Sequence, residues 1–265
     1  MSIVNSSLVS VIMPAYNAEK TIEKSIKSVL SQDYMGWELI VINDCSNDKT
    51  MEIVERFMTD DSRIKMINLK KNAGISKARN IGIKHGKGRY LAFLDSDDIW
   101  RAKKLSSQLK FMASEGYAFT FTSYDLMDFN GHLLGKTIHA KRVVDYRKLL
   151  TNNCIGCLTV LIDRESIPVV TMPGIKHEDY ATWLNILKKG IKAFGLDESL
   201  AVYRVSEHSS SANKRETISW IWTIYRRNQG FGILKSLFLL ILNMSKLILK
   251  YVKTGRLISV IKRVR

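Results

Sequence analysis

The sequence predicts an α/β protein with a mostly parallel central sheet flanked by helices. Short apolar runs alternate with amphipathic segments through the first half of the chain, which is the pattern of repeated strand–helix–strand units. The 265 residues are 46% hydrophobic, enough to bury a full core. Near the C-terminal end, apolar and basic residues mix and predict a basic amphipathic helical tail.

In the first half, each apolar run is followed by a turn or helix signal. Pro14 ends the first run, and Ile22, Ile26 and Val29 then fall on one face of a helix. Further helices are expected through 50–57 and over 76–85, the latter ended by Gly86 as the glycine needed past a helix C-terminus. The expected strands are 9–13, 38–42, 64–69 and 90–94.

The pattern changes beyond Trp100. A polar amphipathic helix is expected up to about Ser114, followed by a β-rich run at 118–123 and a turn at Asn130-Gly131. Another strand is expected near 158–162. A helix then follows His177-Glu-Asp179.

The net charge of +16 is concentrated at the C-terminal end. Residues 204–265 carry 13 Lys and Arg against two Glu, a net charge of +11, which leaves +5 for residues 1–203. These basic residues lie beside an apolar stretch and not beside a helix-turn-helix, RNP or zinc-finger pattern. The charge therefore favours an anionic membrane surface as partner and no nucleic acid.

Two arrangements of the tail remain open. The charge-free stretch between Lys235 and Lys246 has ten residues, short of the ~20 that a spanning helix needs. The tail is then either a helix lying in the membrane interface or a helix that packs on the domain with a solvated basic face. Because the chain does not open with a basic and then an apolar segment, we expect a cytoplasmic protein, peripheral on the inner face of the membrane.

Three carboxylates are packed into the four positions of Asp95-Ser-Asp-Asp98, directly after an apolar strand. Unpaired carboxylates at such a place repel one another unless a cation shares them. Mg²⁺ and Mn²⁺ use one or two carboxylates together with phosphate oxygens, which makes a metal-bound diphosphate one interpretation. A helix N-cap with acids that interact with the helix dipole is the other.

Polar residues also follow the first two strands. Asp44 ends the second strand, where it would accept a hydrogen bond from a base N–H, and Pro14-Ala-Tyr-Asn17 ends the first, with Tyr16 placed for stacking. Since ligands of open α/β sheets bind at the carboxyl ends of the strands, these segments are expected to meet in one polar crevice.

Four segments in this order resemble glycosyltransferase family 2, whose members are inverting enzymes of the GT-A fold. They are 9–17, 38–44, 72–80 and 90–98, which read VSVIMPAYN, ELIVIND, NAGISKARN and YLAFLDSDD. The likeness is close over about the first 100 residues and recurs to about residue 213. Four motifs together are far more specific than a single D-x-D.

The resemblance implies a donor site for a UDP-sugar. Asp44 would bind the uracil, in a nucleotide pocket lined by Pro14, Ala15, Tyr16 and Asn17. Position 45 is Cys where the family commonly has Gly, which would alter the loop near the base without removing the Asp44 carboxylate.

The acidic turn would complete the donor site. Asp95 would face the ribose or the metal, Ser96 would help to bind the donor nucleotide, and Asp97 would be the principal ligand of Mn²⁺ or Mg²⁺. Arg79 would either approach the diphosphate or form a structural ion pair.

The resemblance also implies catalytic and phosphate-binding residues in the second half. Asp179 matches the family's general base, and Glu178 would orient the site or contact the acceptor. In the segment 203–211, which resembles the family's Y-R-x-x-x-x-S-x-S, the expected diphosphate donors are Arg204, Ser209 and Ser211. His208 is a candidate metal ligand, although the family's frequent His lies two positions earlier.

Together these features predict transfer of a hexose or N-acetylhexosamine from a UDP-sugar to a glycan acceptor, expected to be polyprenyl-diphosphate-linked, in surface-polysaccharide synthesis. Residues 1–98 would bind the donor, 99–213 would bind the acceptor, and 214–265 would form the membrane-associating tail. Alternatives are a metal-dependent sugar nucleotidyltransferase, whose usual glycine-rich loop is missing from 14–18, and a non-catalytic membrane-surface protein. The sequence does not indicate the oligomeric state.

Overall fold

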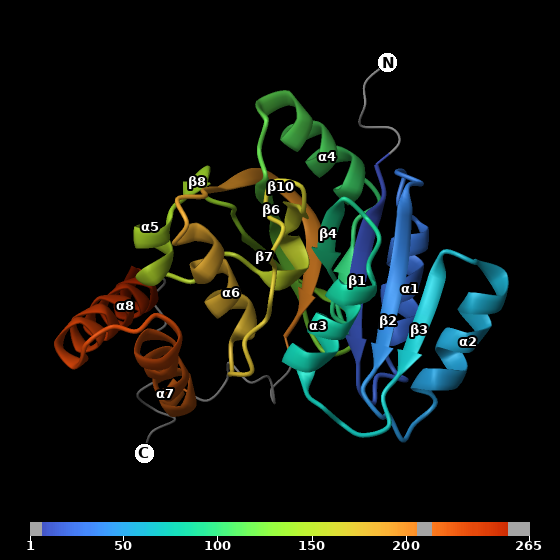
Figure 1. Ribbon diagram of the computed structural model, residues 1–265, viewed down its shortest axis with the longest axis horizontal. Coiled ribbons are helices and arrows are strands. Elements are labelled where there is room, and N and C mark those ends of the chain that lie inside the picture. The colour runs from blue at the N-terminus through green and yellow to red at the C-terminus, as the bar shows by residue number, and fades with distance from the viewer. Residues whose placement is uncertain (1–6, 206–213, 254–265) are drawn as a thin grey trace.

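The computed structural model describes residues 7–205 and 214–253. Within that part of the chain, one central sheet is covered by helices on both faces (Figure 1). The helices are α1 (Ile22–Leu30), α2 (Thr50–Asp60), α3 (Ile75–His85), α4 (Lys104–Glu115), α5 (Tyr146–Leu150), α6 (Glu178–Leu187), α7 (Lys214–Thr223) and α8 (Ile233–Lys253), with a π-helical segment at Ile224–Asn228.

The sheet is parallel in its first half and mixed in its second. Its order is β3 (Ile64–Asn68), β2 (Trp37–Asn43), β1 (Val9–Ala15), β4 (Tyr90–Phe93), β9 (Leu161–Asp163), β6 (Phe119–Met127), β10 (Ala193–Arg204) and β5 (Ile99–Trp100), with β7 (Leu133–Ile138) on β6 and β8 (Val143–Val144) on β10. The first four strands and the β6–β10 pair are parallel, whereas β9 runs antiparallel to both of its neighbours. The predicted α/β class is confirmed, and the change of direction at β9 joins the two halves.

The buried strands divide their side chains between two cores. In β1, Ile12 points into the core that contains α3 and α6, while Val11 and Met13 point into the core that contains α1, α2 and α4. Because both faces are covered, the strands are apolar at nearly every position, as in other parallel sheets.

Pro14 and Gly86 do not have the effects that the sequence predicted. β1 continues through Pro14. The nitrogen of Pro14 lies on the side of β1 that faces β4, where Ile12 O accepts from Leu94 N at 3.0 Å. β4 ends at Phe93, before it would pair with Pro14. The missing N–H therefore breaks no ladder hydrogen bond. Gly86 has φ −64° and is not a left-handed cap. The glycines after α3 instead allow close approach to β1, since a Cβ at Gly88 would lie 2.6 Å from Ser10 N.

The helices after residue 214 pack on the α6 side of the sheet. Ile221, Ile224, Tyr225 and Leu239 are buried in the same core as α6. The Tyr225 hydroxyl donates a hydrogen bond to Leu150 O, which anchors this segment beneath α5. None of the helices in the described ranges combines the length and the apolar character that crossing a membrane requires.

Candidate active site

A cleft of about 1080 Å³ lies at the carboxyl ends of β1, β2 and β4. Its position is the one expected for ligand binding in an open α/β sheet. Nine of the residues singled out in the sequence line it, namely Pro14, Ala15, Tyr16, Asn17, Asp44, Asp95, Ser96, Asp97 and Arg204. Arg79, Glu178 and Asp179 are not among the lining residues.

The loops after β1 and β2 hold each other in place. Asn17, in the left-handed region with φ 49°, accepts from Asn47 N through its side-chain oxygen at 2.9 Å, and its own N–H donates to Ser46 Oγ at 3.0 Å. Tyr16 stands next to this junction with half of its surface exposed in the cleft. Its ring is therefore available for stacking on a flat ligand.

Asp44 is buried at the end of β2, and two backbone amides orient its carboxylate. Ala73 N donates to one oxygen at 2.7 Å and Gly74 N donates to the other at 2.9 Å. Gly74 precedes α3 with φ 84°, so the same contacts fix the start of that helix. The carboxylate is thus held at the cleft wall with its acceptor lone pairs already directed.

Cys45 adopts φ 64°, in the region that favours glycine. Cys45, where the family commonly has Gly, therefore keeps the left-handed turn with a strained backbone. The neighbouring Asp44 remains in place.

The acidic turn carries more negative charge than its neighbours neutralise. Asp95 pairs with Arg79 at 2.5 Å. Burial, helped by the charge of Asp95, raises the pKa of Asp97 to about 6, and no other described residue donates a hydrogen bond to its carboxylate. Asp98 accepts from Arg204 N at 2.8 Å through Oδ1, but its buried Oδ2 has no partner among the described residues.

This chemistry fits a hard divalent cation at Asp97. An unshared buried carboxylate is stabilised by a cation, and oxygen ligands suit Mg²⁺ and Mn²⁺. Among residues 7–205 and 214–253, no group of three or more His, Cys, Asp or Glu side chains is arranged to hold a metal ion by itself. Such an ion would therefore need further ligands, which phosphate oxygens commonly provide.

Arg204 supports the acidic turn from β10. Its Nε donates to Asp97 O at 2.8 Å, and Nη1 donates to Phe129 O at 2.7 Å. The guanidinium lines the cleft while tying the turn to the β6–β7 connection. The other expected phosphate contacts, Ser209 and Ser211, and the candidate ligand His208 lie outside the described residues.

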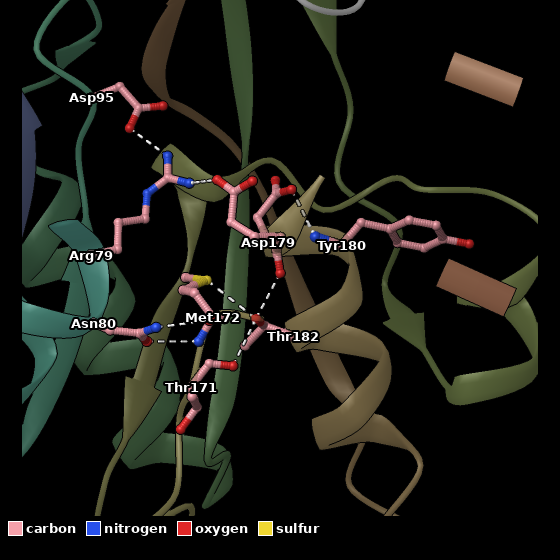
Figure 2. Close-up of polar contacts among 9 residues, drawn as sticks. Arg79, Asn80, Asp95, Thr171, Met172, Asp179, Tyr180 and Thr182 are labelled. Carbon is pink, nitrogen blue, oxygen red and sulfur yellow. Dashed lines mark hydrogen bonds and ion pairs between the residues drawn. The ribbon is translucent and has the colours of Figure 1, made fainter. Parts of the chain in front are cut away.

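Arg79 joins the donor side of the site to α6. The side chain is buried on α3, and its guanidinium donates to Asp95, as Figure 2 shows. Its Nη1 also donates to Glu178. Of the two roles left open by the sequence, the structural ion pair is the one that the geometry supports. Two carboxylates share a single buried cation, so removing it would leave both uncompensated.

Glu178 and Asp179 form the first turn of α6, after His177 in a left-handed conformation. Asp179 is half-buried, and its Oδ1 accepts from Tyr180 N at 2.7 Å, as Figure 2 shows. Burial raises the pKa of Asp179, while the nearby Arg79 charge opposes the increase. Its Oδ2 accepts no hydrogen bond from another described residue, as a proton-accepting group requires.

Asn80 positions the segment that leads into α6, a role that sequence reasoning missed. Its side-chain amide exchanges two hydrogen bonds with the backbone of Met172, both at 2.8 Å (Figure 2). Thr182 then donates to Thr171 O at 3.1 Å. The only signal for Asn80 was its place beside Arg79 in the third motif.

Tyr124 on β6 was also missed, because nothing in an apolar β-rich run marks one tyrosine. Its ring packs edge-on against Tyr203, with centroids 6.2 Å apart. Burial raises its pKa to about 12, and the charges of Asp98 and Asp179 add to the shift. Tyr124 is therefore close enough to the acidic turn and to the start of α6 for their charges to act on its hydroxyl.

Comparisons with known proteins agree with this arrangement. The sequence profile of glycosyl transferase family 2 matches residues 10–165. TuaG of Bacillus subtilis (strain 168), a glycosyltransferase named for teichuronic acid biosynthesis, is 45% identical over 230 residues, which cover 86% of this chain and 91% of TuaG. WfgD of Escherichia coli, a UDP-Glc:alpha-D-GlcNAc-diphosphoundecaprenol beta-1,3-glucosyltransferase, is 43% identical over 218 residues, which cover 82% of this chain and 85% of WfgD.

The fold has a counterpart among solved structures. The mannosyltransferase PcManGT from Pyrobaculum calidifontis, in complex with GDP-Man and Mn²⁺, superposes with a TM-score of 0.66 at 17% identity, over 91% of this chain and 74% of that chain. At this identity the likeness concerns the fold alone. It confirms the predicted GT-A architecture.

Proposed function

This chain belongs to glycosyl transferase family 2, and on that premise we propose that it moves a hexose or N-acetylhexosamine from a UDP-sugar to a lipid-linked saccharide. The observation that carries the proposal is the buried Arg79, which pairs with Asp95 in the acidic turn that contains Asp97 and with Glu178, the neighbour of Asp179. The Asp97 carboxylate faces the cleft at the strand ends, and Asp179 lies in the first turn of α6 with a raised pKa. The proposal therefore assigns activation of the leaving group to Asp97 and activation of the acceptor hydroxyl to Asp179.

The donor nucleotide occupies the cleft in this proposal. The base stacks on Tyr16 and donates to Asp44, while Pro14, Ala15 and Asn17 line the pocket. Asp95 and Ser96 face the ribose. Arg204, Ser209 and Ser211 contact the diphosphate.

A divalent metal at Asp97, with Asp95 and His208 as candidate further ligands, would neutralise the charge that develops on the departing diphosphate. The described residues fit such an ion because Asp97 faces the cleft with a carboxylate that no other described residue hydrogen-bonds. PcManGT, a relative in fold, has been solved with Mn²⁺.

Asp179 acts as the general base for an inverting displacement. The acceptor hydroxyl oxygen forms a bond to the anomeric carbon on the face opposite the diphosphate, and its proton passes to the Asp179 carboxylate. The bond between the anomeric carbon and the phosphate oxygen breaks, and its electron pair leaves with UDP. Glu178, held by Arg79, orients Asp179 and the acceptor.

The acceptor is inferred to be a polyprenyl-diphosphate-linked saccharide in surface-polysaccharide synthesis. WfgD is named for such an acceptor and TuaG for a surface glycan. We assign donor binding to residues 1–98, acceptor binding to 99–213 and membrane association to 214–265, on the cytoplasmic face of the membrane.

The test is a transfer assay with purified protein, GlcNAc-diphosphate-polyprenol and a panel of UDP-Glc, UDP-GlcNAc and GDP-Man, with Mn²⁺ or Mg²⁺. We expect a β-linked product and release of UDP. A chelator or Asp97→Asn should lower the rate about a hundredfold, because charge stabilisation of the leaving group is lost. Asp60→Asn, an exposed acid on α2, serves as the control.

Release of pyrophosphate would identify a nucleotidyltransferase instead. Full activity of Asp97→Asn would contradict the metal-dependent mechanism, and retention of the donor's anomeric configuration would contradict Asp179 as base for an inverting reaction.

A further inference from the structure

The outer face of α8 exposes a stripe of large apolar side chains. Its members recur at i, i+1, i+4, i+5 and i+8, which places them within an arc of roughly 140° at about 100° per residue. Their exposed fractions are Ile233 62%, Leu234 84%, Leu237 46%, Phe238 60% and Ile241 59%. We refer to these residues as the α8 stripe.

The opposite side of α8 holds the helix against the protein. Ser236 is fully buried and donates to Gly232 O at 2.9 Å, and Leu239 belongs to the core that includes α6. Asn243 reaches the Tyr225 hydroxyl at 3.4 Å. The stripe is therefore directed outward by packing, and α8 lies at the edge of the molecule in Figure 1.

A smaller group of exposed apolar residues, Phe129, Leu133 and Leu134, lies at the β6–β7 hairpin, where Phe129 lines the cleft. Most of the other exposed apolar residues on the described surface stand singly. Met35, Val169 and Met51 lie on separate loops or helices, and single exposed residues of this kind need no explanation. On α8, by contrast, the five members of the stripe fall within nine consecutive positions. A contiguous patch of that kind marks an interaction surface.

We propose that the α8 stripe docks the protein on an anionic lipid bilayer, with its apolar side chains entering the boundary between headgroups and acyl chains. The proposal rests on the proposed function, whose acceptor is lipid-linked. A helix with an apolar face and basic flanks lies in the plane of the interface. Because one side of α8 is buried in the protein core and only the other side is exposed, the proposed contact is made by the surface of the helix.

The charge around α8 favours lipid over a second copy of this chain. Residues 254–265 contain Arg256, Lys262, Arg263 and Arg265 and no Asp or Glu, and residues 204–265 together carry +11. Anionic headgroups attract such a segment. Two copies joined through their stripes would instead bring like charges together.

Docking through α8 would also orient the acceptor side of the site. Leu239 of α8 and Tyr180 of α6 are buried in the same core, so α8 packs on the part of the molecule that carries Asp179. The bilayer contact therefore sets how the start of α6, with Asp179, faces a lipid-linked acceptor. Deleting α8 would expose this core, so point variants are the better probe.

The experiment uses the full chain with Leu234→Glu and Phe238→Glu together, floated with phosphatidylglycerol–phosphatidylcholine vesicles and with pure phosphatidylcholine vesicles. We expect the wild type to bind the anionic vesicles and the double variant to lose at least about tenfold in partitioning, because two apolar side chains no longer enter the interface. Met35→Glu with Val169→Glu, at comparable exposure away from α8, should bind as the wild type does. Leu234→Ser, at a position 84% exposed, gives a milder change that leaves folding intact.

Wild-type partitioning by both α8 variants would overturn the proposal. A shift of the lipid-free protein from dimer to monomer in the double variant, measured by light scattering, would also overturn it and assign the stripe to a second copy. Transfer to a short-chain, water-soluble acceptor distinguishes failure of the proposed function from failure of the proposed docking. Failure of wild-type transfer contradicts the function, whereas retained transfer with unchanged partitioning contradicts only the docking.

Discussion

The donor side and the acceptor side of the site are built in different ways. On the donor side, Asp44 and Asp97 follow strands of the parallel sheet within a few residues, and register places them at one edge. On the acceptor side, Asp179 stands on a helix whose start is held by residues about a hundred positions earlier in the chain, Asn80 through Met172 and Arg79 through Glu178. Local sequence therefore positions the residues that we propose bind the donor, and long-range contacts position Asp179, the proposed base.

Arg79 belongs to both sides, because it pairs with Asp95 and with Glu178. A substitution that acts on one side alone should leave substrate binding on the other side unchanged. A substitution of Arg79 should change binding on both sides. The predictions below test this division.

The largest expected effect is on the acceptor side. Asp179→Asn should lower kcat by about 10²–10⁴, the usual contribution of a general base, while UDP binding measured by calorimetry stays as in the wild type. The control is Asp33→Asn, an exposed acid after α1.

The raised pKa of Asp179 also predicts how the transfer rate of the wild type depends on pH. The base must be deprotonated, and burial raises its pKa, so the rate should fall as the pH falls through that raised value. With the divalent metal saturating, so that Asp97 stays ionised, the acidic limb should be missing in Asp179→Asn. Weakened UDP binding in this variant would break the division between the two sides.

Arg79→Met should damage both sides and the fold. Losing the buried cation leaves Glu178 and Asp95 without their partner, which costs about 3–5 kcal/mol when a buried pair is broken. Denaturant unfolding measures the loss, and the KM values for donor and acceptor should both rise. Lys77→Met, an exposed change on the same helix, should do neither. A change confined to one KM would show that Arg79 serves one side only.

Asp44→Asn should weaken the donor side alone. The amide can accept at one end only, so one of the hydrogen bonds from Ala73 N and Gly74 N is lost together with the contact to the base. UDP affinity should fall about ten- to hundredfold, as expected for hydrogen bonds to a charged group. The acceptor KM is the internal control, and an equal rise in it would count against the separation.

Tyr124→Phe should have the smallest effect and act on the acceptor side. The charges of Asp98 and Asp179 act on its hydroxyl, and we expect this hydroxyl to bind a hydroxyl group of the acceptor. Losing one such hydrogen bond should raise the acceptor KM about two- to tenfold. Tyr117→Phe, whose ring stacks on Phe194, is the matched control. Unchanged acceptor kinetics would remove Tyr124 from the site.

The C-terminal helix α8 combines a buried side and an exposed apolar side. The sequence left open whether the helix packs on the domain or lies in the membrane interface. In the structure, one side of α8 is buried through Ser236 and Leu239, and the other exposes Leu234 and Phe238. The mixture of apolar and basic residues contained both surfaces but did not say which position belonged to which.

The sequence by itself determined the α/β class, the strands of the first half and the group of polar residues around the cleft. These depend on local properties: the period of apolar residues decides helix or strand, and a residue that follows a parallel strand is brought to the binding edge. The tertiary structure alone decided that the sheet changes direction at β9, that Arg79 pairs with Glu178, and that Asn80 holds the segment before α6. Those contacts join segments far apart in the chain, and no local periodicity records which distant residue will become a neighbour when the cores are packed.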